Sequence, residues 1–122
     1  MTDTSFLEWP FLSKLHKDLY FKLEDWAQNN LKDLDHSNVD ETCKSLVSKL
    51  GLAGFLNYSG VSEEKPKVDV RSLCLIRETL AKHDGLADFS FAMQGLGSMP
   101  ISLHGNSEQQ KFWLPKIQSG DA

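Results

Sequence analysis

The sequence of 122 residues is poor in several residue types, and each shortage excludes a class of protein. There are two cysteines, Cys43 and Cys74, each among apolar neighbours in a helical pattern, so we expect buried free thiols of the kind that suit a reducing cytoplasm. No apolar run approaches the roughly 18–20 residues that span a bilayer. The acidic start of the chain lacks the basic and apolar regions of a secretory signal. We therefore expect a cytoplasmic protein with no membrane span.

Clustered positive charge is also missing. Thirteen Lys and Arg are mixed among seventeen Asp and Glu, which gives a formal net charge of -4. Binding to a phosphate backbone needs grouped cations, so no nucleic-acid partner is expected. The four histidines are scattered, with no pair at the i, i+4 spacing of helical metal ligands, and the two cysteines are too far apart for a Cys-x-x-Cys half-site. No metal site is expected.

Apolar residues recur at helical spacing through most of the chain. The first helical segment is predicted over residues 9–31, with Pro10 in its first turn and one apolar stripe: Leu12, Leu15, Leu19, Leu23 and Trp26. Asn38 and Glu41 form a capping box that starts a second helix, and Gly51 is predicted as the left-handed residue after its end. Residues 57–67 read as a loop, and could be a mobile surface connection.

A third helix is predicted from Asp69, its cap, to the KHDG at residues 82–85. Residues 86–96 are apolar around nearly the whole helical circumference, which predicts burial on more than one side by core, ligand or partner; from periodicity alone, a central core helix is favoured. Gly95, Gly97 and Pro100 are predicted to interrupt this helix. Since no convincing alternating strand is found, we predict an all-α, up-and-down bundle of about five to six helices, in one domain of residues 1–122.

The last helix is predicted to begin with a capping box in which Ser107 is the cap and Gln110 is its partner. It is predicted to end at Pro115 and Gly120. Catalytic motifs are not found. The Gly-x-Gly at residues 95–97 lacks the third glycine and the βαβ setting of a dinucleotide-binding loop. A triad of His83 and Asp84 with Ser90 or Ser102 can be imagined, but nothing in the sequence brings these residues together.

Residues 68–122 resemble the N-terminal helical domain of the acyl-CoA dehydrogenase family. The most specific stretch is GNSEQQKFWLPKIQSGD, residues 105–121, which follows the order of a recurrent family signature; RETLA and the following helix with its Gly-x-Gly also match in order. The first 67 residues resemble the family in length and helical pattern, although their FLEWPF opening departs from its usual start. The resemblance implies that the chain ends at a domain boundary, before a middle β-domain and a C-terminal four-helix domain.

The resemblance also implies a function. Family members bind FAD mainly between the two later domains, with help from a neighbouring subunit, and remove hydrogens from the α and β carbons of an acyl-CoA. A carboxylate base takes the α-proton and the flavin accepts a hydride. That base lies in the C-terminal domain, so no catalytic or FAD-binding residue is carried over to this chain. The acyl-pocket wall is carried over, to Phe89, Ala92, Met93 and Leu96.

Three readings of the function are left. In the first, the chain is the N-terminal part of an acyl-CoA dehydrogenase, whose partners are acyl-CoA, the two missing domains and other copies of the protein, and it is inactive by itself. In the second, it is a stand-alone helical module that binds a protein partner through its apolar helix. An independent hydrolase is the third and has little support.

Overall fold

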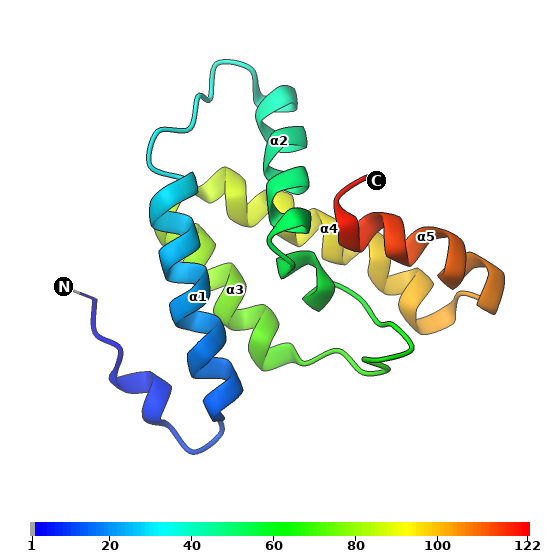
Figure 1. The fold of residues 1–122 in the computed structure, drawn as a ribbon, viewed down its shortest axis with the longest axis horizontal. Helices are drawn as coiled ribbons and strands as arrows, with labels where there is room; N and C mark the ends of the chain where they lie inside the picture. The colour runs from blue at the N-terminus through cyan, green and yellow to red at the C-terminus, as the bar shows by residue number, and fades with distance from the viewer. Residues whose placement is uncertain (1) are drawn as a thin grey trace.

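The computed structural model describes residues 2–122, and every regular element in this range is a helix (Figure 1). The all-α prediction is confirmed. The elements, in chain order, are two short 3-10 helices and five α-helices: η1 (Ser5–Glu8), α1 (Lys14–Asn30), α2 (Val39–Leu52), η2 (Phe55–Tyr58), α3 (Val70–His83), α4 (Gly85–His104) and α5 (Ser107–Ser119).

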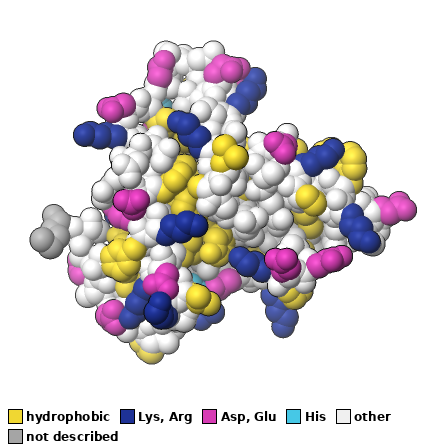
Figure 2. Space-filling view, in the orientation of Figure 1, with side chains coloured by type: hydrophobic (Ala, Val, Ile, Leu, Met, Phe, Trp, Pro, Cys, Tyr) yellow, Lys and Arg dark blue, Asp and Glu magenta, His cyan; other side chains and the backbone are white. Residues whose placement is uncertain are grey.

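The helix α4 is the central element of the bundle. It packs against α3, α2 and α5, whereas α1 packs mainly on α3. Figure 1 shows α1 and α3 side by side, with α4 crossing behind α2 and α5 returning along α4. On the face drawn in Figure 2, acidic and basic side chains are interspersed, so that face carries no large patch of one charge.

One main core joins the first four α-helices and η2. Its most deeply buried side chains are Leu23, Ala27, Leu46, Leu50, Phe55, Leu56, Ile76, Leu80, Ala87 and Phe91. A smaller cluster of Leu7, Tyr20 and Leu75 holds η1 against α1 and α3. The predicted stripe of α1 is confirmed at Leu19 and Leu23 and wrong at Leu15, which is 79% exposed.

Two predicted helix ends are corrected at the beginning of the bundle. Pro10 lies in the turn before α1, which starts only after Ser13, because Ser13 and His16 form the cap. Asn38 caps α2 as predicted and accepts from the Glu41 amide at 3.3 Å, but the return bond of the predicted capping box is not formed, because the Glu41 carboxylate accepts from Lys44 at 2.9 Å instead. Gly51 does not end α2 but lies inside it, and the left-handed residue is Gly54, with φ of 82°.

Gly51 has a packing role instead of a conformational one. A Cβ at this position would collide with the carbonyl of Ser119, so α2 and the end of α5 approach more closely than any side chain allows. The predicted cap at Gly120 is confirmed: this residue has φ of 82° and follows the last residue of α5.

The predicted interruption of α4 is wrong. The helix runs without a break over 20 residues, through Gly95, Gly97 and Pro100. Glycine costs about 1 kcal/mol in a helix and proline removes one hydrogen bond. These local penalties are smaller than the gain from packing α4 against three other helices.

The start of α5 is displaced by one residue from the prediction. The capping box is formed by Asn106 and Gln109, and not by Ser107 and Gln110. The Asn106 side chain accepts from the Gln109 amide, and the Gln109 side chain accepts from the Asn106 amide. Pro115, predicted to help end the helix, lies inside it.

The prediction of two buried thiols is wrong for Cys74. Cys43 is half-buried, but Cys74 is exposed because the core side of α3 is formed by its neighbours Leu75 and Ile76.

The first part of the loop 57–67 is fixed to the bundle. The Ser98 hydroxyl donates to the Ser59 carbonyl at 2.7 Å, the Val61 amide donates to Ser102 Oγ at 3.2 Å, and Gln118 Nε2 donates to the Val61 carbonyl at 3.3 Å. These bonds come from both α4 and α5. The loop is therefore a docked segment at this point, and not the mobile connection that the sequence allowed.

Candidate functional site

The outer face of α4 carries the side chains that the sequence singles out. Phe89, Met93 and Leu96 are 53%, 40% and 66% exposed, and Ala92 beside them is half-buried. Residues at i, i+4 and i+7 lie on one side of a helix, so the three large side chains form one stripe. The same side continues toward the C-terminal end of α4 with the exposed Pro100 and Leu103. We call this stripe, Phe89 to Leu103, the outer apolar face.

The opposite side of α4 is in the core. Ala87 and Phe91 are buried among the main core side chains, Ser90 is buried between them in the chain, and Ser98 and Ser102 are buried further along the helix. Thus the all-round apolar pattern of this helix has two causes: one side packs in the core, and the other is open over much of its surface. An exposed apolar surface of this kind is a common mark of a binding face.

The start of α4 is held in place by hydrogen bonds from two directions. Asp84 accepts from the amides of Leu86 and Ala87 at 2.9 and 3.0 Å and from His36 Nε2 at 2.8 Å. One turn later, Nε and Nη2 of Arg77 donate to the two oxygens of the Asp88 carboxylate, each at 2.9 Å. Phe89 therefore projects from a helix turn whose position is fixed by α3 and by the loop after α1.

The triad imagined from the sequence is not assembled. His83 contacts Glu24 of α1 at 3.0 Å, whereas Asp84 caps α4, and Ser102 accepts from Val61. Burial opposes the ionisation of Glu24, but hydrogen bonds from Lys82 and His83 outweigh it and lower its pKa. This cluster joins α1 to α3, and its contacts are accounted for by that role.

A serine, a histidine and an aspartate are hydrogen-bonded in series at another place, between the starts of α1 and α3. His16 is buried; its Nδ1 lies 2.9 Å from both the Ser13 amide and Ser13 Oγ, and its Nε2 lies 2.6 Å from Asp69 Oδ2. Because the Ser13 amide can only donate, Nδ1 is the acceptor and Nε2 carries the proton. The Nδ1 lone pair is therefore engaged by the helix cap, and the arrangement is explained as a link between two helix starts.

Sequence reasoning missed this link because 53 residues separate His16 from Asp69. Asp69 was correctly predicted as the cap of α3, where its Oδ1 accepts from the Arg71 amide at 3.2 Å. The only available signal for the second role of Asp69 was the placement of a histidine on the apolar side of the first helix.

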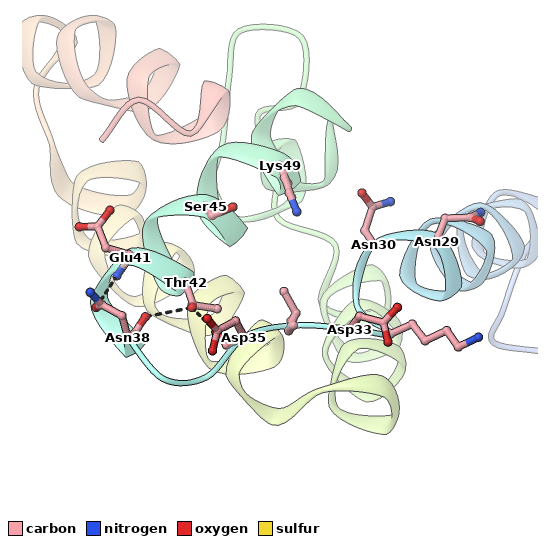
Figure 3. Close-up of a pocket in the computed structure, with 11 residues that line it drawn as sticks. Asn29, Asn30, Asp33, Asp35, Asn38, Glu41, Thr42, Ser45 and Lys49 are labelled. Carbon is pink, nitrogen blue, oxygen red and sulfur yellow. Dashed lines mark hydrogen bonds between the residues drawn. The ribbon is translucent and has the colours of Figure 1, made fainter.

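A polar depression lies between the end of α1, the following loop and α2 (Figure 3). Figure 3 shows Asn38 and Thr42 hydrogen-bonded within its wall: Asn38 caps α2, and the Thr42 hydroxyl donates to the Asp35 and Asn38 carbonyls. Within residues 2–122, no group of three or more His, Cys, Asp or Glu side chains is placed to hold a metal ion. The side chains of this depression are those of a capped loop.

No helix among the described residues has both the length and the apolar character needed to cross a bilayer. This finding agrees with the absence of long apolar runs in the sequence.

Comparison with known proteins identifies the family. Residues 13–121 match the family described as acyl-CoA dehydrogenase, N-terminal domain. A "probable acyl-CoA dehydrogenase" of Bacillus subtilis (strain 168) is 29% identical over 112 residues, which cover 87% of this chain and 18% of the relative. The chain therefore spans less than a fifth of the length of that relative. The match takes in all five α-helices, and the chain belongs to the acyl-CoA dehydrogenase family, through its N-terminal helical domain.

Proposed function

We propose that residues 1–122 form the N-terminal helical domain of an FAD-dependent acyl-CoA dehydrogenase, and that α4 supplies a wall of the acyl pocket. The observation that carries the proposal is the outer apolar face of α4, which belongs to the matched domain and is open in this chain. Phe89, Met93 and Leu96 present only carbon and sulfur atoms there. Such a surface suits an alkyl chain, since burying each methylene is worth about 0.8 kcal/mol.

Within this wall, the small side chain at Ala92 is the feature that leaves room for the end of an acyl tail. Phe89, one turn earlier, is the bulky neighbour that limits the space. The rest of the outer apolar face, toward Leu103, would pack against the domains that follow the helical domain in the whole enzyme.

The dehydrogenation itself is assigned to other domains of the parent enzyme. The chemistry that FAD would supply there is hydride acceptance, and the base would be a carboxylate of a later domain. We assign no residue of this chain to the cofactor and none to the base, because the family resemblance assigns both to the two later domains. The contribution of this domain is to exclude water from the acyl tail and to limit its length.

The parent enzyme would be a homo-oligomer of the cytoplasm, acting in fatty acid metabolism. A second candidate is a stand-alone helical module that binds a partner protein through the same face of α4. The exposure of that face supports both candidates. They differ in what the face binds: an acyl chain with neighbouring domains in the first, a separate protein in the second.

The experiment is to place Ala92→Phe in the full-length enzyme and to measure kcat/KM over a series of acyl-CoA chain lengths. Because the added ring occupies the end of the pocket, we expect the preference to move to shorter chains by at least one pair of methylenes, with a loss of about tenfold for the longest substrates that the parent accepts. Ala81→Phe, at an exposed position of α3, is the matched control and should leave the preference unchanged. An unchanged preference in Ala92→Phe would remove Ala92 from the pocket.

A further inference from the structure

A second concave site lies away from the outer apolar face, where the docked loop meets the end of α4 and the side of α5. Its volume is about 410 Å³, which falls in the range of small-ligand pockets. Apolar side chains of the loop and of α5 form part of its lining: Val61, Pro66, Leu114 and Pro115. The remaining lining is polar. Some of its hydrogen-bonding groups already have partners among the described residues, and others do not.

Two glutamines of α5 line the site with their amide nitrogens already engaged. Gln110 Nε2 donates to the carbonyls of Ile101 and Ser102, both at 3.2 Å, and Gln118 Nε2 donates to the Val61 carbonyl at 3.3 Å. Because carbonyl oxygens only accept, these contacts fix the orientation of both amides. Among residues 2–122, no donor is found for either Oε1 atom, so both are available as acceptors.

One buried donor belongs to the same lining. Ser102 is 8% exposed and its Oγ accepts from the Val61 amide at 3.2 Å, while its own O–H has no acceptor in the part of the chain that the structure describes. The charged residues of the lining are Glu63 and Lys111, which have opposite signs. The site thus offers two side-chain acceptors and a buried hydroxyl donor in a wall with no net charge.

We propose that this site binds a small neutral ligand through a primary carboxamide group. The two N–H bonds of such a group satisfy the Oε1 atoms of Gln110 and Gln118, its carbonyl accepts from the Ser102 hydroxyl, and a short alkyl or aryl part covers Leu114 and Pro115. A carboxylate ligand would meet the same acceptors without donors, and an ammonium ion would leave the hydroxyl without an acceptor. This site is independent of the acyl pocket proposed above.

The test uses the 122-residue chain labelled with nitrogen-15, with propionamide as the probe and methyl propionate as its matched partner of similar shape without N–H donors. We expect saturable shifts of the Val61 backbone amide and of the Gln118 side-chain amide with propionamide. Binding of methyl propionate should be about fivefold weaker or more, because two acceptors stay unsatisfied. This comparison needs no variant, so it does not depend on the folding of a mutant.

A variant then locates the contact. Gln118→Leu should weaken propionamide binding by about fivefold, while Gln28→Leu, an exposed glutamine of α1, should not change it. The proposal is overturned if propionamide gives no saturable shifts at this site, or if the two probes bind equally. Equal binding to Gln118→Leu and the parent chain would also overturn it, because the acceptor that the proposal names would then have no role.

Discussion

Asp69 is the residue whose charge we expect to contribute most clearly to stability. Burial opposes the ionisation of its carboxyl, but hydrogen bonds from His16, Arg71 and Ser72 outweigh burial and lower its pKa from 3.8 to about 2. The bonds are 2.6 Å from His16 Nε2, 3.1 Å from Arg71 Nε and 3.0 Å from the Ser72 hydroxyl. This carboxylate therefore joins the start of α3 to the start of α1.

The magnitude follows from the pKa difference. At 1.36 kcal/mol per pKa unit, a change from 3.8 to about 2 corresponds to roughly 2.4 kcal/mol. The Asp69 side chain is 38% exposed, so solvent screening reduces the expected contribution to about 1–1.5 kcal/mol. Since the folded-state pKa is lowered, this stability is present above pH 4 and is lost as the pH falls through 2.

The perturbation is Asp69→Asn, which keeps a good helix-capping oxygen, removes the charge and replaces the second acceptor oxygen by an amide NH2 group. We expect its free energy of unfolding at pH 7 to be about 1–1.5 kcal/mol below that of the parent, and the difference to fall to about half or less at pH 2. Asp69→Ala should lose about 1 kcal/mol more at pH 7, because the cap of α3 is removed as well.

The assay is urea unfolding followed by far-UV circular dichroism at a series of pH values. Asp25→Asn, at an exposed position of α1, is the matched control and should stay within about 0.5 kcal/mol of the parent. If the difference between Asp69→Asn and the parent is the same at pH 7 and pH 2, the charge is not the source of the stability and the reasoning is refuted.

The other predictions concern packing, cofactor and association. Gly51→Ala should lower the free energy of unfolding by about 1–3 kcal/mol, because its Cβ would collide with the Ser119 carbonyl. Gly97→Ala is the control, since nothing lies within 4 Å of its Cβ. In the same urea assay, its free energy of unfolding should be unchanged or higher by up to about 1 kcal/mol. The purified chain should be colourless in a visible spectrum, and a yellow preparation with stoichiometric flavin would contradict this. Light scattering should show a mass that rises with protein concentration, because the outer apolar face is open. Leu96→Glu should suppress this rise. A strict monomer at high concentration would contradict the prediction of self-association.

The sequence alone determined the helical class and the position of most elements. Spacing of apolar residues located all five α-helices, and local chemistry located the caps at Asn38, Asp69 and Gly120. These predictions succeeded because periodicity and capping depend on residues that are near one another in the chain. The same holds for the family, since its signature at residues 105–121 is a linear one.

Some residues of α4 and its candidate site could be named from the sequence, but their surroundings could not. The all-round apolar pattern did not show which side of α4 packs in the core, and the resemblance selected Phe89, Ala92, Met93 and Leu96 by alignment. The structure places Phe91 in the core and Phe89, Met93 and Leu96 on the exposed side. That division depends on which helices surround α4, and periodicity carries no information about it.

Only the tertiary structure decided the continuity of α4 and the contacts of residues distant in the chain. Gly95, Gly97 and Pro100 each weaken a helix locally, yet packing against α2, α3 and α5 outweighs these penalties of a few kcal/mol. Likewise, the bond from His16 to Asp69 joins residues 53 positions apart, and Gly51 is required by the approach of α5 and not by its own backbone angles. Local free energies fix where helices can form, and the sum of many distant contacts decides where they continue and what they meet.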